Sequence, residues 1–245
     1  MNNGKYMYCF VEGRVEGEHD LKGIGGYGGV YFINTEGITV VVSDVPYKVY
    51  EPSRENAMTH EKIIQHFMKG YNLVPCSFGN VFKSKDDLLK FMLKVGGQIR
   101  ENLEKVRDKM EVGLRVFWKK SVFTEEVETR HIKEFKEDLM KRADSETYYS
   151  RIEFGKMVEE QVNRLREHYA ASIFDPLAKH AIDARLNDAS NPLMVLNAAF
   201  LIQNSREQEF DAYVDTVMKK YADRMDFSYS GPWPPYNFTS INAKG

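Results

Sequence analysis

Ser230-Gly-Pro-Trp-Pro-Pro-Tyr-Asn-Phe238 is the stretch on which the predicted fold depends, because it combines three prolines with three large aromatic residues. Proline fixes its own φ angle and biases the preceding residue away from the helical region, so the segment must follow an extended or polyproline-like path. Trp233, Tyr236 and Phe238 each carry roughly 150 to 250 Å² of surface that favours burial. The sequence therefore predicts a stiff C-terminal tail that docks, with Trp233 largely buried.

The residues leave two docking modes open for this tail. In the first, the tail packs across its own chain and joins two domains. In the second, it presents a proline and aromatic motif to another protein. The two modes are compatible, and both make Trp233, Tyr236 and Phe238 the candidate interdomain or partner-binding residues.

Length and composition place the 245-residue chain among globular proteins of one large or two ordinary domains. Its 34 basic residues are balanced by 36 acidic ones, which disfavours nucleic acid and anionic membranes as partners. The apolar runs are too short to span a bilayer and the N-terminus lacks an apolar signal core, so we expect a cytoplasmic protein. Cys9 and Cys76 lie in apolar, strand-like contexts and are expected to be free, reduced thiols.

The first half of the chain contains strand-like and helix-like patterns. A helix is predicted from Thr59, as its cap, to Lys69, and a longer one over 84–110, where apolar residues recur every three or four positions up to Met110. We place a domain boundary near residue 112. The predicted strands are 6–11, which we expect to be central, 30–33, 38–43, and a short strand and turn within 73–82.

Two motifs in this half match known site patterns only formally. Gly23-Ile-Gly-Gly-Tyr-Gly28 fits the GxGxxG pattern, but it precedes a predicted strand instead of opening a helix, so we interpret it as a loop. His60 and His66 resemble a zinc-protease pair. Their spacing of six rotates them about 240° apart on a helix, which favours an ordinary surface helix. We find no grouping with the spacing that catalysis, a cofactor or a metal requires, and expect none of these.

The second half is predicted to order itself as strand, two helices, strand, helix and strand. The charged region 125–188 is expected to be an antiparallel helical hairpin with solvated outer faces. The other predicted elements are strands at 113–118, 193–202 and 226–229, and a helix from Ser205, as its cap, to Arg224. The fold class expected is α+β with two domains: an N-terminal α/β domain (1–112), a C-terminal ferredoxin-like domain with the hairpin (113–229), and the docked tail (230–245).

The chain resembles the gas vesicle proteins GvpF and GvpL over nearly its whole length. The segments that carry the resemblance are 6–11, Val40-Val-Val-Ser-Asp-Val-Pro46, His60-Glu61, Val74-Pro-Cys-Ser-Phe-Gly-Asn-Val-Phe82, Val195-Leu-Asn-Ala-Ala-Phe-Leu-Ile202 and, most specifically, 230–238.

This resemblance implies a non-enzymatic minor component of gas vesicles, the gas-filled organelles that provide buoyancy. The implied partners are the hydrophobic shell protein, whose aggregation the protein would limit during vesicle nucleation, and other accessory proteins. Such a role needs an apolar binding patch, which the 14 tyrosines, 15 phenylalanines and 11 methionines make feasible. The alternative function is a regulatory adaptor of ferredoxin-like fold that binds a small ligand.

Overall fold

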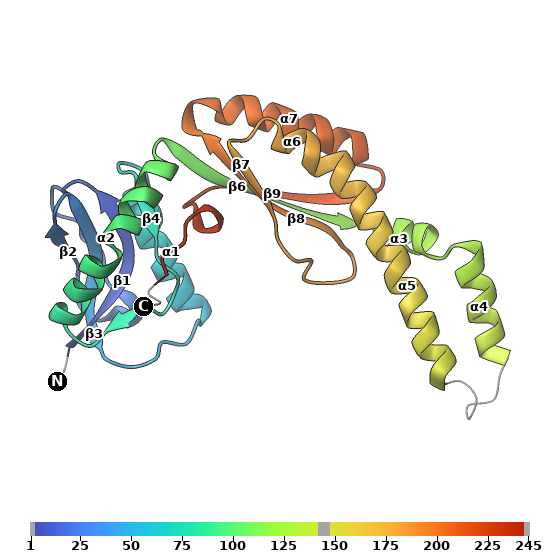
Figure 1. Ribbon diagram of the computed structural model, residues 1–245, viewed down its shortest axis with the longest axis horizontal. Coiled ribbons are helices and arrows are strands. Elements are labelled where there is room, and N and C mark those ends of the chain that lie inside the picture. The colour runs from blue at the N-terminus through green and yellow to red at the C-terminus, as the bar shows by residue number, and fades with distance from the viewer. Residues whose placement is uncertain (1–2, 142–147, 243–245) are drawn as a thin grey trace. The chain divides into compact units, whose positions relative to one another are not determined.

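The computed structural model describes residues 3–141 and 148–242 (Figure 1). By its internal contacts the chain separates into two compact units. Unit 1 consists of the residues up to Glu111 and those from Pro232 onward, and unit 2 is Val112–Gly231. The expected mixture of helices and sheets is confirmed. The domain ranges 1–112, 113–229 and 230–245 stay a prediction, and the tail groups with unit 1 instead of standing alone.

Unit 1 contains a sheet in the strand order β2-β3-β1-β4, with β5 also paired to β1. β1 therefore has neighbours on both sides, which confirms its predicted central position. The pairs β1–β3, β1–β4, β1–β5 and β2–β3 are all antiparallel. The strands are β1 (Asn3–Glu12), β2 (Val30–Thr35), β3 (Ile38–Pro46), β4 (Leu73–Pro75) and β5 (Val81–Phe82).

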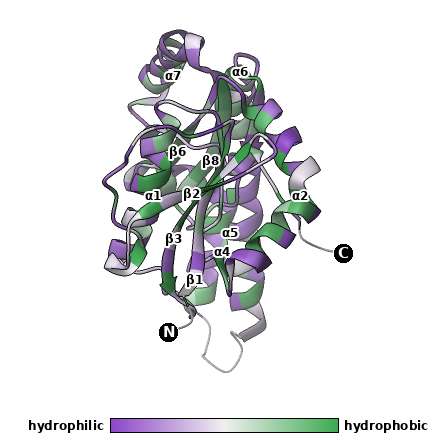
Figure 2. Cartoon of the chain, turned by 90° about the vertical axis from the view of Figure 1, so that its left-hand side faces the viewer, coloured by the Kyte–Doolittle hydropathy of each residue, from purple (hydrophilic) through white to green (hydrophobic). Residues whose placement is uncertain are grey.

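Helices cover both faces of this sheet: α1 (Arg54–Met68) lies on one side and α2 (Lys85–Val106) on the other (Figure 2). Tyr6 and Tyr8 pack with the apolar face of α1, whereas Met7 and Phe10 pack with that of α2. The alternation breaks once, because the β1–β3 register shifts between Met7 and Cys9. This bulge turns Cys9 to the same face as Tyr8.

The ends of both helices differ from those predicted. The helix α1 begins before Thr59, because Ser53 Oγ accepts the Asn56 amide at 3.2 Å and caps it. The helix α2 is continuous but ends at Val106. Asp108 then adopts a positive φ of 56°, and Met110 belongs to the next strand instead of the helix stripe. Helical periodicity alone does not show such a break, because the strand continues the apolar pattern.

The glycine motif forms the loop that its context predicted. Ile24–Gly26 is a short 3-10 turn that leads into β2, with no helix after it. Gly25, Gly26 and Gly28 have φ between 57° and 72°, a region that disfavours side chains with a Cβ.

Unit 2 is built around a sheet in the order β7-β8-β6-β9 (Figure 1). Two predictions here were wrong. Part of the region predicted to be helical is the strand β7, which pairs with β8. Ser205 lies in a 3-10 turn and does not cap the following helix. The elements are β6 (Lys109–Trp118), β7 (Asp183–Leu186), β8 (Met194–Gln203), β9 (Met225–Trp233) and the helices α6 (Asp175–Ala178) and α7 (Glu207–Tyr221).

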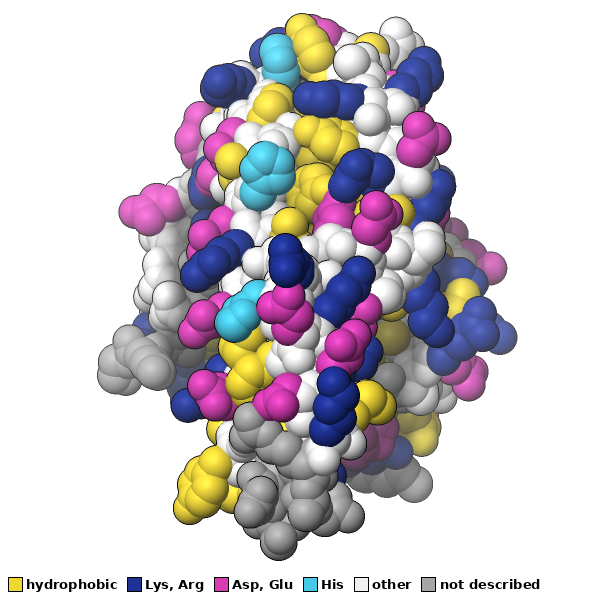
Figure 3. Space-filling model, turned by 90° about the vertical axis from the view of Figure 1, so that its right-hand side faces the viewer, with side chains coloured by type: hydrophobic (Ala, Val, Ile, Leu, Met, Phe, Trp, Pro, Cys, Tyr) yellow, Lys and Arg dark blue, Asp and Glu magenta, His cyan; other side chains and the backbone are white. Residues whose placement is uncertain are grey.

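The charged middle of the chain forms the helices α3 (Lys120–Val127), α4 (Arg130–Lys141) and α5 (Tyr148–Tyr169), followed by a π-helical turn at Ala170–Phe174. The helices α4 and α5 pack together, and residues 142–147 of the predicted hairpin lie outside the described residues. Side chains of both charges are interspersed over this face (Figure 3). We therefore see no single-sign field there that would select a charged partner.

Glu126 holds these helices to the sheet. Its carboxylate accepts Trp118 Nε1–H at 3.1 Å and the Tyr169 hydroxyl at 2.6 Å, and it pairs with the Arg224 guanidinium. The side chain of Glu126 is 9% exposed, so these hydrogen-bond donors replace the water molecules that its carboxylate loses on burial.

Among the described residues, no helix has both the length and the apolar character needed to cross a membrane.

Candidate functional site

The tail begins as a continuation of a strand. β9 runs on to Trp233, beyond the predicted end at residue 229. Its place at the end of the sheet order explains how Pro232 fits, because an edge strand can lack one amide donor. Trp233 itself is partly buried, and the prediction that it is largely buried stays a prediction. It lies in the part of β9 that belongs to unit 1.

Residues 234–238, which we call the anchor, dock on unit 1 through buried side chains. Pro234 and Pro235 are buried, and Phe238 is 2% exposed. Tyr236–Phe238 forms a short 3-10 turn. Tyr236 is half-buried against the core around α1, and Lys105 Nζ lies 5.9 Å from the centre of the Phe238 ring. Of the three predicted aromatics, Phe238 therefore makes the most complete contact with the chain itself.

Two carboxylates accept hydrogen bonds from the polar groups of the anchor. Glu61 on α1 accepts the Tyr236 hydroxyl at 3.0 Å. Glu111, which is 6% exposed, accepts the Asn237 amide N–H at 2.8 Å and its side-chain Nδ2–H at 2.5 Å. Burial, followed by the charge of Glu61, raises the pKa of Tyr236, and burial also raises the pKa of Glu61. The Tyr236 hydroxyl therefore keeps its proton and acts as the donor in this hydrogen bond.

Residues 239–242, which we call the strap, follow the anchor and lie along α2. Asn102 accepts the Ser240 amide at 3.1 Å and donates Nδ2–H to the Ser240 carbonyl at 3.0 Å. Gln98 does the same for Asn242, at 2.9 Å and 3.2 Å. Gln98 and Asn102 are one helical turn apart, so they lie on one face of α2. Their amides pair with alternate residues of the strap as a neighbouring strand would.

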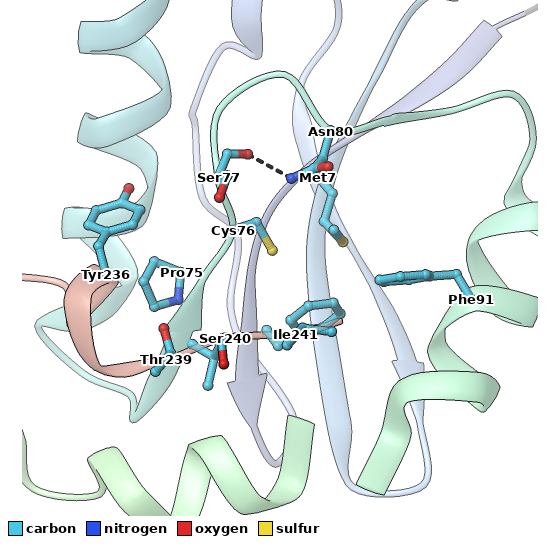
Figure 4. Close-up of a pocket in the computed structure, with 12 residues that line it drawn as sticks. Met7, Pro75, Cys76, Ser77, Asn80, Phe91, Tyr236, Thr239, Ser240 and Ile241 are labelled. Carbon is cyan, nitrogen blue, oxygen red and sulfur yellow. Dashed lines mark hydrogen bonds between the residues drawn. The ribbon is translucent and has the colours of Figure 1, made fainter. Parts of the chain in front are cut away.

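A cavity of about 210 Å³ lies between the strap and the sheet (Figure 4). Tail residues form one wall of it, including Thr239, Ser240 and Ile241. The opposite wall comes from β1, from β4 and the loop after it, and from α2. It consists of Met7, Phe10, Val74, Pro75, Cys76, Ser77, Asn80 and Phe91. The lining of the cavity is therefore mixed: apolar side chains such as Met7, Phe10 and Phe91 share it with polar groups, including those of Ser77 and Asn80.

A buried histidine on α1 bonds to one of the residues that line the cavity, Cys76. His60 is 4% exposed, so it belongs to the core and not to the surface of the helix as predicted. Its Nε2–H donates to the Cys76 carbonyl at 3.0 Å, which leaves Nδ1 to accept the Tyr6 hydroxyl at 3.1 Å. The Tyr6 oxygen in turn accepts the Gly79 amide at 3.0 Å. Burial lowers the pKa of His60, which keeps the ring neutral and this network satisfied.

The second histidine of that predicted pair lies elsewhere. The ring of His66 contacts His19, with 2.9 Å between His66 Nε2 and His19 Nδ1. Within 3–141 and 148–242, no group of three or more His, Cys, Asp or Glu side chains is arranged to hold a metal ion. Cys9 and Cys76 are free and buried, as predicted, and burial raises the pKa of both thiols. Buried thiols with raised pKa values are poor nucleophiles.

The arrangement as a whole is suited to recognition of a chain segment. It offers carboxylate acceptors, paired amides and a cavity with both apolar and polar lining along one extended path. Glu61, Glu111, Gln98 and Asn102 were not predicted as site residues, because in sequence they are ordinary polar positions. The one available signal was the pair of amides spaced four apart on the predicted helix, which places them on one face.

Comparison with known proteins gives one consistent picture. Residues 4–240 match the family described as "Gas vesicle synthesis protein GvpL/GvpF". The chain is 25% identical to gas vesicle protein F of Haloferax mediterranei, over 99% of this chain and 96% of that protein. It is 26% identical to gas vesicle protein F of a Nostoc species, over 99% and 100% of the two chains.

Solved structures agree with these sequence matches. The crystal structure of GvpF from Anabaena superposes with a TM-score of 0.81 at 25% identity, covering 98% of this chain and 99% of that one. GvpF from Microcystis aeruginosa gives a TM-score of 0.80 at 25% identity, covering 96% and 98%. Sequence and fold therefore match the same proteins over almost their whole lengths.

Proposed function

Because this chain belongs to the GvpL/GvpF family of gas vesicle synthesis proteins, we propose that it is a non-enzymatic assembly factor of gas vesicles. In this role it binds the hydrophobic shell protein and limits its aggregation while vesicles nucleate. The observation that carries the proposal is the match over residues 4–240, which includes both units and the tail.

An assembly factor for an apolar subunit needs accessible apolar surface, and unit 1 has it. Tyr47 and Val49 are exposed at a hollow of about 480 Å³ that Tyr50 and Phe78 also line. The cavity under the strap adds further apolar side chains, among them Phe10 and Phe91, in the same unit. Exposed apolar patches on a folded domain mark interaction sites, so this surface supports a binding role.

We further infer that the two units are separate domains and that unit 2 is ferredoxin-like. Two features support this inference. The strand order β7-β8-β6-β9 follows from two strand-helix-strand halves, and helices connect β6 to β7 and β8 to β9. We expect the protein to work in the cytoplasm and at the gas vesicle, together with other accessory proteins.

Co-expression with the shell protein tests this function. The expected result is that the shell protein stays in the supernatant and co-purifies with this chain, but sediments when the chain is absent. A matched test is deletion of the gene in a host that makes vesicles, which should abolish or stunt them while shell protein is still made. Equal sedimentation with and without the chain would refute the proposal.

A further inference from the structure

The hydrogen bonds that hold the strap to α2 do not depend on the strap's own side chains. Gln98 and Asn102 bond to the backbone amides and carbonyls of Ser240 and Asn242, at 2.9 to 3.2 Å. Any extended segment except proline offers the same groups. These hydrogen bonds are exposed, so water competes for them. The strap is therefore both replaceable in sequence and easily released, in contrast to the anchor before it.

The only strap side chain that packs into the apolar core is Ile241, and it leaves space unfilled. Ile241 packs beside the cluster that contains Met7 and Phe10 and is only partly buried. A cavity of about 210 Å³ remains beside it. The apolar part of its lining, which includes Met7, Phe10 and Phe91, lacks a packing partner there and would gain dispersion contacts with an inserted apolar group. A segment with a larger apolar side chain at this position would fill the space better than Ile241 does.

We propose that the groove under the strap, between α2 and the β1–β4 part of the sheet, binds an extended apolar segment of the shell protein in trans, and that the strap is its occupant in cis. This proposal rests on the proposed function. The segment takes the path of residues 239–242, its backbone pairs with Gln98 and Asn102, and a large apolar side chain enters the cavity. The shell segment can bind only after the strap has left the groove. Occupancy of the groove by the strap therefore lowers the apparent affinity of the chain for the shell protein.

Variants of the full chain separate the strap from the groove. Ile241→Asp places a charge against the apolar side chains that line the cavity and releases the strap, while every groove residue stays intact. Asn242→Ala is the matched control, because Asn242 bonds to Gln98 through its backbone. Adding Gln98→Ala and Asn102→Ala to Ile241→Asp removes the amides of the groove. Val49→Asp tests the other apolar surface, since Val49 is 86% exposed.

The experiment measures capture of co-expressed shell protein by each tagged variant, with melting curves to establish that each one folds. We expect Ile241→Asp to bind at least about tenfold more tightly than the parent chain, Asn242→Ala to bind like the parent, and the triple variant to lose the gain. A synthetic peptide of residues 236–245 should compete, and the same peptide with Ile241→Asp should not.

Several outcomes overturn the inference while the proposed function stands. Capture that is equal for the parent and Ile241→Asp is one. A second such outcome is that the triple variant still captures more shell protein than the parent chain. A third is that Val49→Asp abolishes capture while Ile241→Asp leaves it unchanged. If no variant captures the shell protein, the proposed function itself fails.

Labelling of the Cys76 thiol is a second measurement of strap release, because this thiol lines the cavity. Its labelling rate should rise in Ile241→Asp, while that of Cys9 stays slow.

Discussion

The anchor and the strap are consecutive parts of one tail, but they dock by different kinds of contact. The anchor is held by buried prolines, by Phe238 and by carboxylates, of which Glu111 is itself buried. The strap is held by amide hydrogen bonds at the surface and by one partly buried isoleucine. Buried contacts contribute to folding, whereas exposed hydrogen bonds contribute little. The anchor therefore contributes more to the stability of the fold than the strap does.

Phe238→Ala should have the largest effect on stability. A fully buried phenylalanine truncated to alanine costs about 3 to 5 kcal/mol, a large part of the stability of a domain. Urea unfolding monitored by circular dichroism measures this loss. Trp233→Ala is the matched comparison, because this side chain is less completely buried and should cost less than Phe238→Ala. A larger loss for Trp233 than for Phe238 would contradict the division between the two residues.

Glu111→Ala should have the next largest effect. It leaves the two Asn237 donors without their charged acceptor in a buried place, at a cost of about 2 to 3 kcal/mol. The same unfolding experiment measures it. Glu104→Ala removes an exposed carboxylate that pairs with Arg107 and should change stability by less than about 0.5 kcal/mol. Equal losses for the two variants would show that the anchor is not held by buried polar contacts.

His60 should make the stability of the chain sensitive to acid. Its pKa in the folded chain lies below the ordinary 6.5, so between these two values the unfolded chain binds more protons. Its contribution to stability is therefore complete above about pH 6.5 and is lost as the pH falls further, by at most about 1.4 kcal/mol per pH unit. The free energy of unfolding should fall less steeply between pH 6.5 and 5 in His60→Gln. Identical slopes would exclude His60 as the source.

The double variant Gln98→Ala, Asn102→Ala should have the smallest effect. Its hydrogen bonds are exposed, so we expect a loss of about 1 kcal/mol or less. Hydrogen exchange at Ser240 and Asn242 should nevertheless become fast, because their amides lose their acceptors. Glu101→Ala, an exposed neighbour on α2, serves as the control. A loss of stability as large as that of Phe238→Ala would make the strap part of the fold.

Local patterns in the sequence predicted much of this architecture. Aromatic and β-branched residues located β1 and β3, and a near-continuous apolar run located β8. Helical periodicity located α2 and α5, because burial of one helix face forces a regular spacing. The prolines and aromatics of 230–238 predicted a docked tail for a similar reason, since proline limits the backbone and large rings favour burial. These features depend on neighbouring residues only, so a single sequence determines them.

The tertiary structure alone decided how the tail is held. Glu111 and Asn237 are 126 positions apart, and no local pattern marks either residue as the partner of the other. Similarly, Trp233 and Phe238 look equivalent in sequence, yet the folded chain buries Phe238 fully and Trp233 only partly. Which side chain is buried depends on the surface that long-range packing places opposite it, and a buried polar group needs an acceptor that only the complete fold supplies.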